Sequence, residues 1–152
     1  MANVKAIPKG MHSLTAQLTV GDAAAAIDVY QRAFGAVEVS RAPDPSGRKI
    51  WHAELRIGDS PIFVNDAFPE MGSVANTTRL WLYGEDVDGA HTRAVGAGLK
   101  SKMPPTDMFW GDRIAQVIDA WGNDWTLAQR VKELSAAEMK EAEEKFVAAM
   151  KK

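Results

Sequence analysis

A weak internal repeat constrains the fold of this chain more than any other feature of its sequence. Gly58 and Gly122 each begin a tight turn that leads into an apolar stretch typical of a strand, and they lie 64 residues apart. The same interval separates Asp22 from Asp86, and each of these aspartates stands between a predicted strand and a predicted helix. One interval that relates two kinds of element indicates a duplicated unit.

The first copy of the unit has a β-α-β-β-β pattern. Alternating polar and apolar residues predict strands over 13–20 and 49–57, and shorter apolar stretches predict strands over 37–42 and 61–65. Apolar residues at helical spacing predict a helix over 23–34, which Asp22 caps and Gly35 ends. Proline, glycine and polar residues predict a linker over 66–76.

The second copy repeats this order. We predict strands over 78–84, 113–119 and 124–130, and a helix that Asp86 caps and that runs to about Gly98. A weak strand over 99–109 is expected to be interrupted by Pro104 and Pro105. One such unit alone would leave a sheet face uncovered, so the two are expected to share one curved sheet.

The sequence therefore predicts an α+β fold with two parts. Residues 1–132 are expected to form one domain of two modules, about 12–66 and 77–131, and residues 133–152 a C-terminal amphipathic helix. Ser135 and Glu138 have the spacing of a capping box at the start of this helix. The apolar face of this helix consists of Met139, Ala142, Phe146, Val147 and Met150. We expect this face to dock on the same domain or on a partner subunit.

Composition excludes several classes of function. The chain has 152 residues, of which 46% are hydrophobic and 25% charged, as in an ordinary globular domain. The net charge of −2 without a basic block disfavours nucleic acid as a partner. The absence of cysteine excludes disulfides, thiolate nucleophiles and cysteine-ligated metals. Because no signal peptide or membrane-spanning run is evident, we expect a cytoplasmic location without membrane partners.

Four stretches of the chain belong together: 18–22 leading into 26–36, 52–59, 85–88, and 109–113 with the hairpin that follows it. They resemble the vicinal oxygen chelate superfamily, the group of glyoxalases, bleomycin resistance proteins and dioxygenases, and the resemblance covers about residues 12–130. It is nearest to a glyoxalase-like subgroup of small bacterial proteins. The resemblance implies paired βαβββ modules that form an open barrel around a small-molecule cavity, commonly as a homodimer.

In metal-using members of that group, four His, Glu or Gln side chains hold a divalent ion. Carried over by position, the four sites fall on Thr15, on Ile62 or Phe63, on Arg79 or Leu80, and on Thr126. A hydroxyl is a weak ligand, and aliphatic, aromatic or cationic side chains do not replace imidazole or carboxylate. We therefore expect no metal cofactor, although the fold is retained.

Face alternation predicts which side chains the cavity presents. Trp81 and Trp110 can stack on a planar ligand, and Arg79 can meet an anion. The alternative is that Trp81 and Tyr83 are plain core residues. The predicted ligand-binding residues are Thr15, Gln17, Arg79, Trp81, Tyr83, Trp110 and Thr126, with Thr19 on the same face.

His52 and Glu54 lie two residues apart on one strand face and are candidates for catalysis. A carboxylate beside an imidazole would make a general base poised near neutral pH. The alternative is an exposed ion pair on the solvent side of the strand. Asp112 and Arg113 are expected either to bind ligand or to pin the Trp110 loop through an Asp-Arg pair, and Asp119 to organise a turn.

Two functions remain open at this point. The first is a glyoxalase-like or bleomycin-resistance-like protein that binds a small planar or aromatic molecule in a metal-free cavity. The second is a lyase, isomerase or dioxygenase, metal-dependent or metal-independent. The missing family-type ligands and the aromatic residues favour the first.

Overall fold

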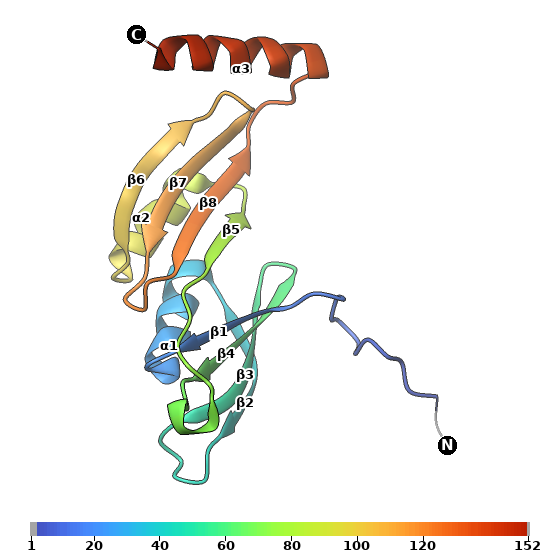
Figure 1. The fold of residues 1–152 in the computed structure, drawn as a ribbon, viewed down its shortest axis with the longest axis vertical. Coiled ribbons are helices and arrows are strands. Elements are labelled where there is room, and N and C mark those ends of the chain that lie inside the picture. Colours follow the sequence, from blue (N-terminus) through green and yellow to red (C-terminus); the bar gives the residue numbers. More distant parts are fainter. Residues whose placement is uncertain (1–2, 152) are drawn as a thin grey trace. The chain divides into compact units, whose positions relative to one another are not determined.

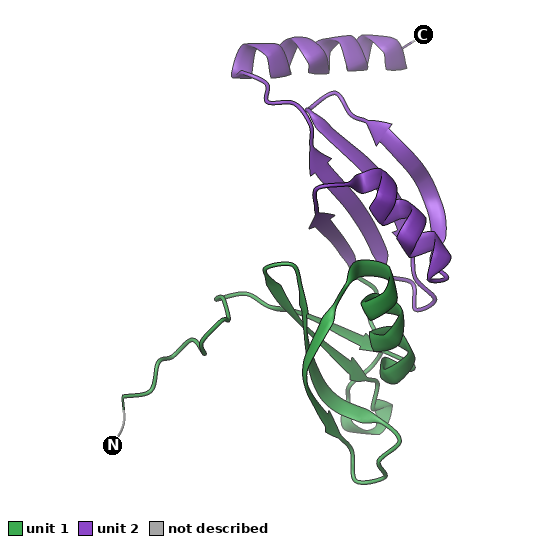
Figure 2. Cartoon of the chain, turned by 180° about the vertical axis from the view of Figure 1, so that it is seen from behind, with its two compact units in different colours: residues 1–78 green, residues 79–152 purple. Residues whose placement is uncertain are grey.

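The computed structural model describes residues 3–151 and divides the chain into two compact units, 1–78 and 79–152 (Figure 2). Each unit contains its own four-stranded mixed sheet with a helix. The expectation of one curved sheet shared by both modules is therefore wrong, because the described strands pair only within their own unit. The predicted α+β class and the C-terminal helix are confirmed.

Unit 1 has the predicted β-α-β-β-β order (Figure 1). Its sheet has the strand order β1-β4-β3-β2, in which β1 pairs with β4 in parallel and the other pairs are antiparallel. The elements are β1 (Ala16–Val20), α1 (Ala23–Phe34), β2 (Val37–Pro43), β3 (Ile50–Ile57), β4 (Ser60–Asp66) and the 3₁₀ helix η1 (Pro69–Met71).

The two ends of α1 are specified by local chemistry. The side chain of Asp22 accepts a hydrogen bond from the backbone N–H of Ala25 at 3.1 Å, which satisfies one free amide of the first turn. Gly35 ends the helix in the left-handed conformation with φ 69°, which glycine adopts without a Cβ penalty. Between these ends, α1 buries one face against the sheet through Ala23, Ala26, Ile27, Tyr30 and Ala33.

Unit 2 repeats this arrangement and adds a C-terminal helix. Its sheet has the order β5-β8-β7-β6, with β5 parallel to β8, which is the topology of unit 1. Asp86 caps α2 by accepting from the backbone N–H of Gly89 at 3.0 Å. The elements are β5 (Arg79–Tyr83), α2 (Val87–Gly96), β6 (Lys100–Asp107), β7 (Asp112–Ile118), β8 (Asp124–Arg130) and α3 (Ala136–Met150).

The predicted interruption at Pro104 and Pro105 is wrong. Strand β6 runs through both prolines, and its pairing with β7 shifts register on either side of Met103. Strand β6 lies at the edge of the sheet, where a missing N–H can face away from the neighbouring strand. The prolines therefore make the edge irregular without ending it.

Helix α3 is well capped but poorly buried. Ser135 and Glu138 form both bonds of the predicted capping box, each at 3.1 Å. The described residues of α3 include no buried side chain. The ring of Phe146 lies 4.8 Å from that of Phe109, so the helix contacts its own unit, while Val147 and Met150 stay exposed.

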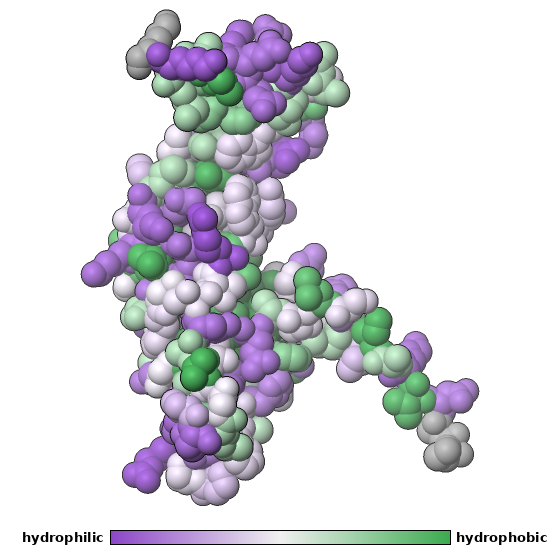
Figure 3. Space-filling view, in the orientation of Figure 1, coloured by the Kyte–Doolittle hydropathy of each residue, from purple (hydrophilic) through white to green (hydrophobic). Residues whose placement is uncertain are grey.

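Within residues 3–151, no helix is long and apolar enough to cross a membrane. Hydrophobic and hydrophilic side chains alternate along the extended N-terminal segment, as Figure 3 shows. In this segment Val4 and Ile7 are exposed.

Candidate functional site

Each sheet has one face under a helix and one face open. In unit 2 the register pairs Leu82 with Leu127 on the α2 side, and Trp81 with Thr126 on the opposite side. In unit 1 it pairs Leu18 with Val64 under α1, and Gln17 with Phe63 on the open side. The predicted cavity residues therefore fall into two groups, one on the open face of each unit.

The open face of unit 2 presents three neighbouring aromatic rings, which we call the aromatic wall: Trp81, Tyr83 and Trp110. The ring of Trp81 lies 6.1 Å from that of Tyr83 and 6.4 Å from that of Trp110. Trp81 is 50% exposed and Tyr83 is 55% exposed, so they are not plain core residues. An exposed ring supported by other rings is suited to stacking on a flat ligand.

One buried carboxylate fixes two of these rings. Asp112 is 1% exposed, and its Oδ2 accepts hydrogen bonds from the Tyr83 hydroxyl and from Trp110 Nε1, each at 2.9 Å. Its Oδ1 accepts from Arg130 Nε at 2.5 Å. The sequence identified Asp112 as a candidate but gave no sign of Arg130, which lies 18 residues away.

The pKa values of this cluster follow from its hydrogen bonds. Burial raises the pKa of Asp112, but the bonds from Arg130, Trp110 and Tyr83 outweigh burial and leave this pKa below its usual value. The bond to Asp112 raises the pKa of the Tyr83 phenol, and burial adds to that effect. At neutral pH, Asp112 is therefore an anion and Tyr83 a neutral donor.

Arg113 contacts a different set of acids. Its guanidinium bonds bidentately to Asp88 at 2.9 Å and to Asp107 at 3.0 Å, which ties β7 to α2 and to the end of β6. The bond to Asp88 and then that to Asp107 raise the pKa of Arg113. Asp112 and Arg113 thus do pin this region, but each pairs with a distant residue and not with the other.

The polar residues near the wall differ in accessibility. Thr126 lies opposite Trp81 in the register and is only 4% exposed. Arg79 is exposed, and its Nε lies 3.9 Å from Asp124, which also pairs with Lys102 at 2.8 Å. The weak pairing leaves the Arg79 guanidinium able to meet an anionic group of a ligand.

The open face of unit 1 carries an amide and hydroxyl network. Asn65 Oδ1 accepts from Gln17 Nε2 at 3.0 Å and from the Thr19 hydroxyl at 2.8 Å. Asn76 accepts from the backbone N–H of Thr19 at 2.9 Å. These bonds occupy the Gln17 and Thr19 side chains within the protein, so this face is more polar and more internally bonded than the aromatic wall.

His52 and Glu54 share this face, as predicted, but have different partners. The imidazole packs edge-on against Phe63, with ring centres 4.5 Å apart. Glu54 lies 3.7 Å from Arg56. In the part of the chain that the structure describes, no hydrogen bond joins His52 to Glu54. The general-base hypothesis therefore has no direct contact to support it.

A cavity of about 550 Å³ lies at the edge of the same face. Thr15, Glu54 and Phe63 line it from the sheet, and residues 6–8 and 11–13 line it from the N-terminal segment. His12 is among these residues, although its position before the first strand gave no reason to select it. His12 reaches the cavity because of the path of the N-terminal segment. That path is held by a hydrogen bond of 3.3 Å from the Arg56 guanidinium to the Gly10 carbonyl.

The family model of the Glyoxalase/Bleomycin resistance protein/Dioxygenase superfamily matches residues 11–127. This match covers most of the chain, from the segment before β1 to the middle of β8. The chain belongs to the glyoxalase/bleomycin resistance protein/dioxygenase superfamily.

Several other proteins are similar to this chain in sequence or structure. The uncharacterized proteins Mb0911c of Mycobacterium bovis and Rv0887c of Mycobacterium tuberculosis are each 39% identical to this chain over 139 residues. Each match covers 86% of this chain, and it covers 91% of Mb0911c and 81% of Rv0887c. The crystal structure of TioX from Micromonospora sp. ML1 is similar, with a TM-score of 0.67 and 27% identity, covering 79% of this chain and 99% of that one. A superfamily enzyme from Burkholderia phytofirmans shares the fold, with a TM-score of 0.62 and 20% identity over 77% and 97% of the two chains.

The four positions to which the resemblance assigns metal ligands carry side chains that bind divalent ions weakly or not at all. The register resolves their ambiguities, because Ile62 and Leu80 lie on the helix-covered faces while Phe63 and Arg79 lie on the open faces. The positions thus carry hydroxyl, phenyl, guanidinium and hydroxyl groups, which are weak ligands or none. Among residues 3–151, no three His, Asp or Glu side chains gather as a metal site would require.

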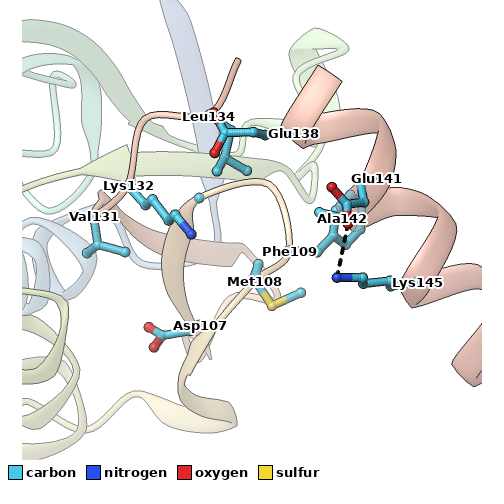
Figure 4. A pocket seen from close by; sticks show the side chains of 11 residues that line it. Asp107, Met108, Phe109, Val131, Lys132, Leu134, Glu138, Glu141, Ala142 and Lys145 are labelled. Carbon is cyan, nitrogen blue, oxygen red and sulfur yellow. Dashed lines mark ion pairs between the residues drawn. The ribbon is translucent and has the colours of Figure 1, made fainter. Parts of the chain in front are cut away.

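Helix α3 lies beyond the matched region of the superfamily and borders a groove of its own. Figure 4 shows the residues that line this groove, from α3 and the 107–109 segment among others. Its volume is about 420 Å³. Glu141 and Lys145 line it and form an ion pair of 3.3 Å. A second hollow of about 670 Å³ lies beside it and includes Met103, Met108, Phe109, Ala142 and Phe146 among its lining residues.

Asp119 organises the turn before β8, as its position predicted. Its Oδ1 accepts from the backbone N–H groups of Trp121 and Asn123, both at 2.9 Å. Its Oδ2 accepts from Trp125 Nε1 at 3.1 Å. These local bonds explain the turn, and we assign Asp119 no role in ligand binding.

Proposed function

We propose that this protein binds a small planar, aromatic molecule on the open face of unit 2, without a metal ion. The observation that carries the proposal is the aromatic wall. Trp81 and Tyr83 are half exposed, and Asp112 holds Tyr83 and Trp110 in place before any ligand arrives. Stacking on a preorganised ring needs little further ordering of the protein, which favours affinity.

The remaining contacts suggest what else the ligand contains. Tyr83 and Trp110 have both given their donors to Asp112, so the wall offers ring faces and few polar groups. The exposed guanidinium of Arg79 lies at the start of the same strand. A flat ring system with a carboxylate or another anionic group is therefore the ligand class that this face fits best.

The experiment is a calorimetric titration of the full chain with 2-naphthoate, a planar aromatic anion. We expect binding that Trp81→Ala weakens at least tenfold. Trp51→Ala is the matched control, because Trp51 is comparably exposed but lies on β3 of unit 1. Binding that is unaffected by Trp81→Ala, or equally affected by Trp51→Ala, would contradict the proposal.

The anionic preference has its own test. 2-Naphthylmethanol has the same ring system without the charge, so it should bind less tightly than 2-naphthoate. Arg79→Gln should reduce the difference between the two compounds by weakening only the anion. Equal affinity of the two compounds for the wild-type chain would show that Arg79 does not contribute to ligand binding. The proposal that the ligand stacks on the aromatic wall would be unaffected.

A metal-independent enzyme is the second candidate, and the cavity in unit 1 favours it. His12 and Glu54 both line that cavity, so an acid and a base can reach one bound molecule. Mass spectrometry of small-molecule extracts incubated with the wild-type chain, and with a His12→Ala, Glu54→Gln chain, would reveal turnover. A product formed equally by both chains would exclude this pair.

We further propose that the chain forms a homodimer, the assembly that its resemblance to the superfamily implies. The exposed apolar side chains Val147 and Met150 on α3 are consistent with a subunit contact. Sedimentation velocity measured over a range of concentrations tests this proposal. A monomer at micromolar to millimolar concentration would exclude it.

A further inference from the structure

Asp112 joins four segments of unit 2 through one carboxylate. It is the first residue of β7, and its three donors come from β5, from the 108–111 loop and from the end of β8. With 1% exposure it is covered by its own donors, so a ligand on the wall does not touch it. A buried carboxylate with three donors, one of them charged, is strongly held.

The backbone of the Trp110 loop is fixed independently of this carboxylate. The carbonyl of Gly111 accepts from the backbone N–H groups of Val131 and Lys132 at 2.9 and 3.1 Å. Gly111 has φ 100°, and a Cβ there would collide with the carbonyl oxygen of Lys132. The loop thus keeps its path through main-chain bonds, and Asp112 adds the orientation of the side chains.

The orientation of Trp110 has few other determinants. Its ring meets Phe109 edge-on at 5.1 Å and Trp81 at 6.4 Å, and both contacts tolerate rotation of the indole more readily than a directed hydrogen bond does. Tyr83 likewise is half exposed and contacts Trp81 on one side. The bonds to Asp112 are therefore the directional restraints on both rings.

We propose that Asp112 is the positioning residue of the ligand site: its charge orders Trp110 and Tyr83 in advance, so ligand affinity depends on a residue that the ligand does not contact. This inference rests on the proposed function. Substitution by asparagine separates charge from shape, because the amide has one oxygen for donors that approach from two sides. With the amide oxygen toward Arg130, the NH₂ group faces Trp110 and Tyr83, and Trp110 loses its acceptor. With the oxygen toward the two rings, the NH₂ group faces Arg130, and the bonds to the rings are weaker because the acceptor is no longer charged.

The test compares the full-length wild-type chain with Asp112→Asn. We expect the dissociation constant for 2-naphthoate to rise at least tenfold. The ¹⁵N indole signals give a second readout, because the Trp110 Nε1–H should shift upfield and exchange faster with water. The Trp125 indole, which bonds to Asp119, should not move.

Asp119→Asn is the matched control for lost stability. It removes the negative charge of another buried aspartate that binds an indole N–H, but in a turn away from the wall. We expect Asp119→Asn to lower the unfolding midpoint without changing the affinity for 2-naphthoate. An equal loss of affinity in both variants would reduce Asp112 to a structural residue and overturn the inference.

The outcomes separate this inference from the proposed function. If Trp81→Ala weakens binding but Asp112→Asn does not, the wall binds ligand and Asp112 does not position it. If the wild-type chain fails to bind 2-naphthoate, the proposed ligand is wrong, and the indole signals still decide whether Asp112 orders Trp110. Should Asp112→Asn fail to fold, the wild-type spectrum decides. A Trp110 indole that is broad and rapidly exchanging in the free protein would overturn the inference, and a sharp, protected one would support it.

Discussion

Single buried carboxylates do much of the organising in this protein. Asp66 accepts from the backbone N–H groups of Ala23 and Ile50 at 2.9 and 2.6 Å, which joins the start of α1 to the start of β3. Asp112 and Asp119 act similarly in unit 2 on rings and turn amides. Each carboxylate is itself buried and has its charge satisfied by several donors, and a buried carboxylate is expensive to leave without them.

Replacing Asp119 therefore should destabilise the protein strongly. Asp119→Ala removes the acceptor of two backbone N–H groups and of the Trp125 indole, and we expect it to lower the free energy of unfolding by about 2–4 kcal/mol. Urea denaturation followed by circular dichroism measures the change. Asp59→Ala is the control, since that turn aspartate is exposed and accepts a local bond from the Ser60 hydroxyl, so its loss should change stability by less than about 0.5 kcal/mol.

Tyr83 gives a prediction for alkaline pH. Its pKa is raised in the folded protein, mainly by the bond to Asp112, so the folded state favours the neutral phenol. The stabilisation is fully present below the ordinary pKa of 10.0 and is lost as pH rises through the folded value. Between pH 9 and 12, the unfolding midpoint in urea should fall more steeply for the wild-type chain than for Tyr83→Phe. Parallel curves for the two chains would contradict the assignment.

The sequence could predict the role of Asp119 but not the partners of Asp112. The donors to Asp119 lie two, four and six residues along the chain, so turn chemistry alone locates them. The donors Tyr83 and Arg130 lie 29 and 18 residues from Asp112 and meet it only because β5, β8 and β7 are neighbours. Local patterns give strand faces, but they do not give the rotamers and cross-strand partners that make a site.

At the scale of elements, the helices α1 and α3 have equally good caps and very different burial. Asp22 caps α1, which packs a row of buried residues against its sheet. Ser135 and Glu138 cap α3, which has no buried residue among those described. Most helical stability in proteins comes from packing of an apolar face, so the two caps should matter in different ways.

Removing each cap tests this difference. Asp22→Ala should lower the free energy of global unfolding by about 1 kcal/mol, because α1 forms only with its unit. Ser135→Ala should leave global unfolding within about 0.5 kcal/mol and instead speed hydrogen exchange in 136–150, because α3 can unfold locally. Hydrogen exchange and urea denaturation of the two variants measure both effects. A large global loss from Ser135→Ala would show that α3 is packed more tightly than its contacts indicate.

Strand β6 shows where element prediction fails. Proline in a strand interior removes a ladder bond, which made a break at Pro104 and Pro105 the natural expectation. The edge position of β6 relaxes that penalty, and edge position is a property of the whole sheet. The helices and the other strands were predicted to within a few residues because their caps, turns and alternation are local.

At the scale of the whole molecule, one duplicated topology carries two different open faces. Two pairs of residues are equivalent in the two units: Gln17 with Phe63, and Trp81 with Thr126. Each pair joins the parallel strands of its unit and lies on the open face of the sheet. Unit 1 uses its face for amide and hydroxyl bonds within the protein, and unit 2 uses its face for exposed rings. The two units thus share a topology but differ in the side chains of their open faces, which is why superfamily membership alone does not give the function.

The same divergence leads to the last prediction, which concerns metal. A bound ion stabilises the folded state by mass action, by about 2.7 kcal/mol when its concentration is a hundred times its dissociation constant. Because the positions to which the resemblance assigns metal ligands carry Thr15, Phe63, Arg79 and Thr126, we expect dialysis against EDTA to leave the melting temperature unchanged within about 1 °C. Differential scanning calorimetry before and after chelation measures this, with zinc, nickel, manganese or iron(II) added back in turn as the control. A drop of several degrees that one of these ions reverses would show that side chains outside those four positions supply a metal site.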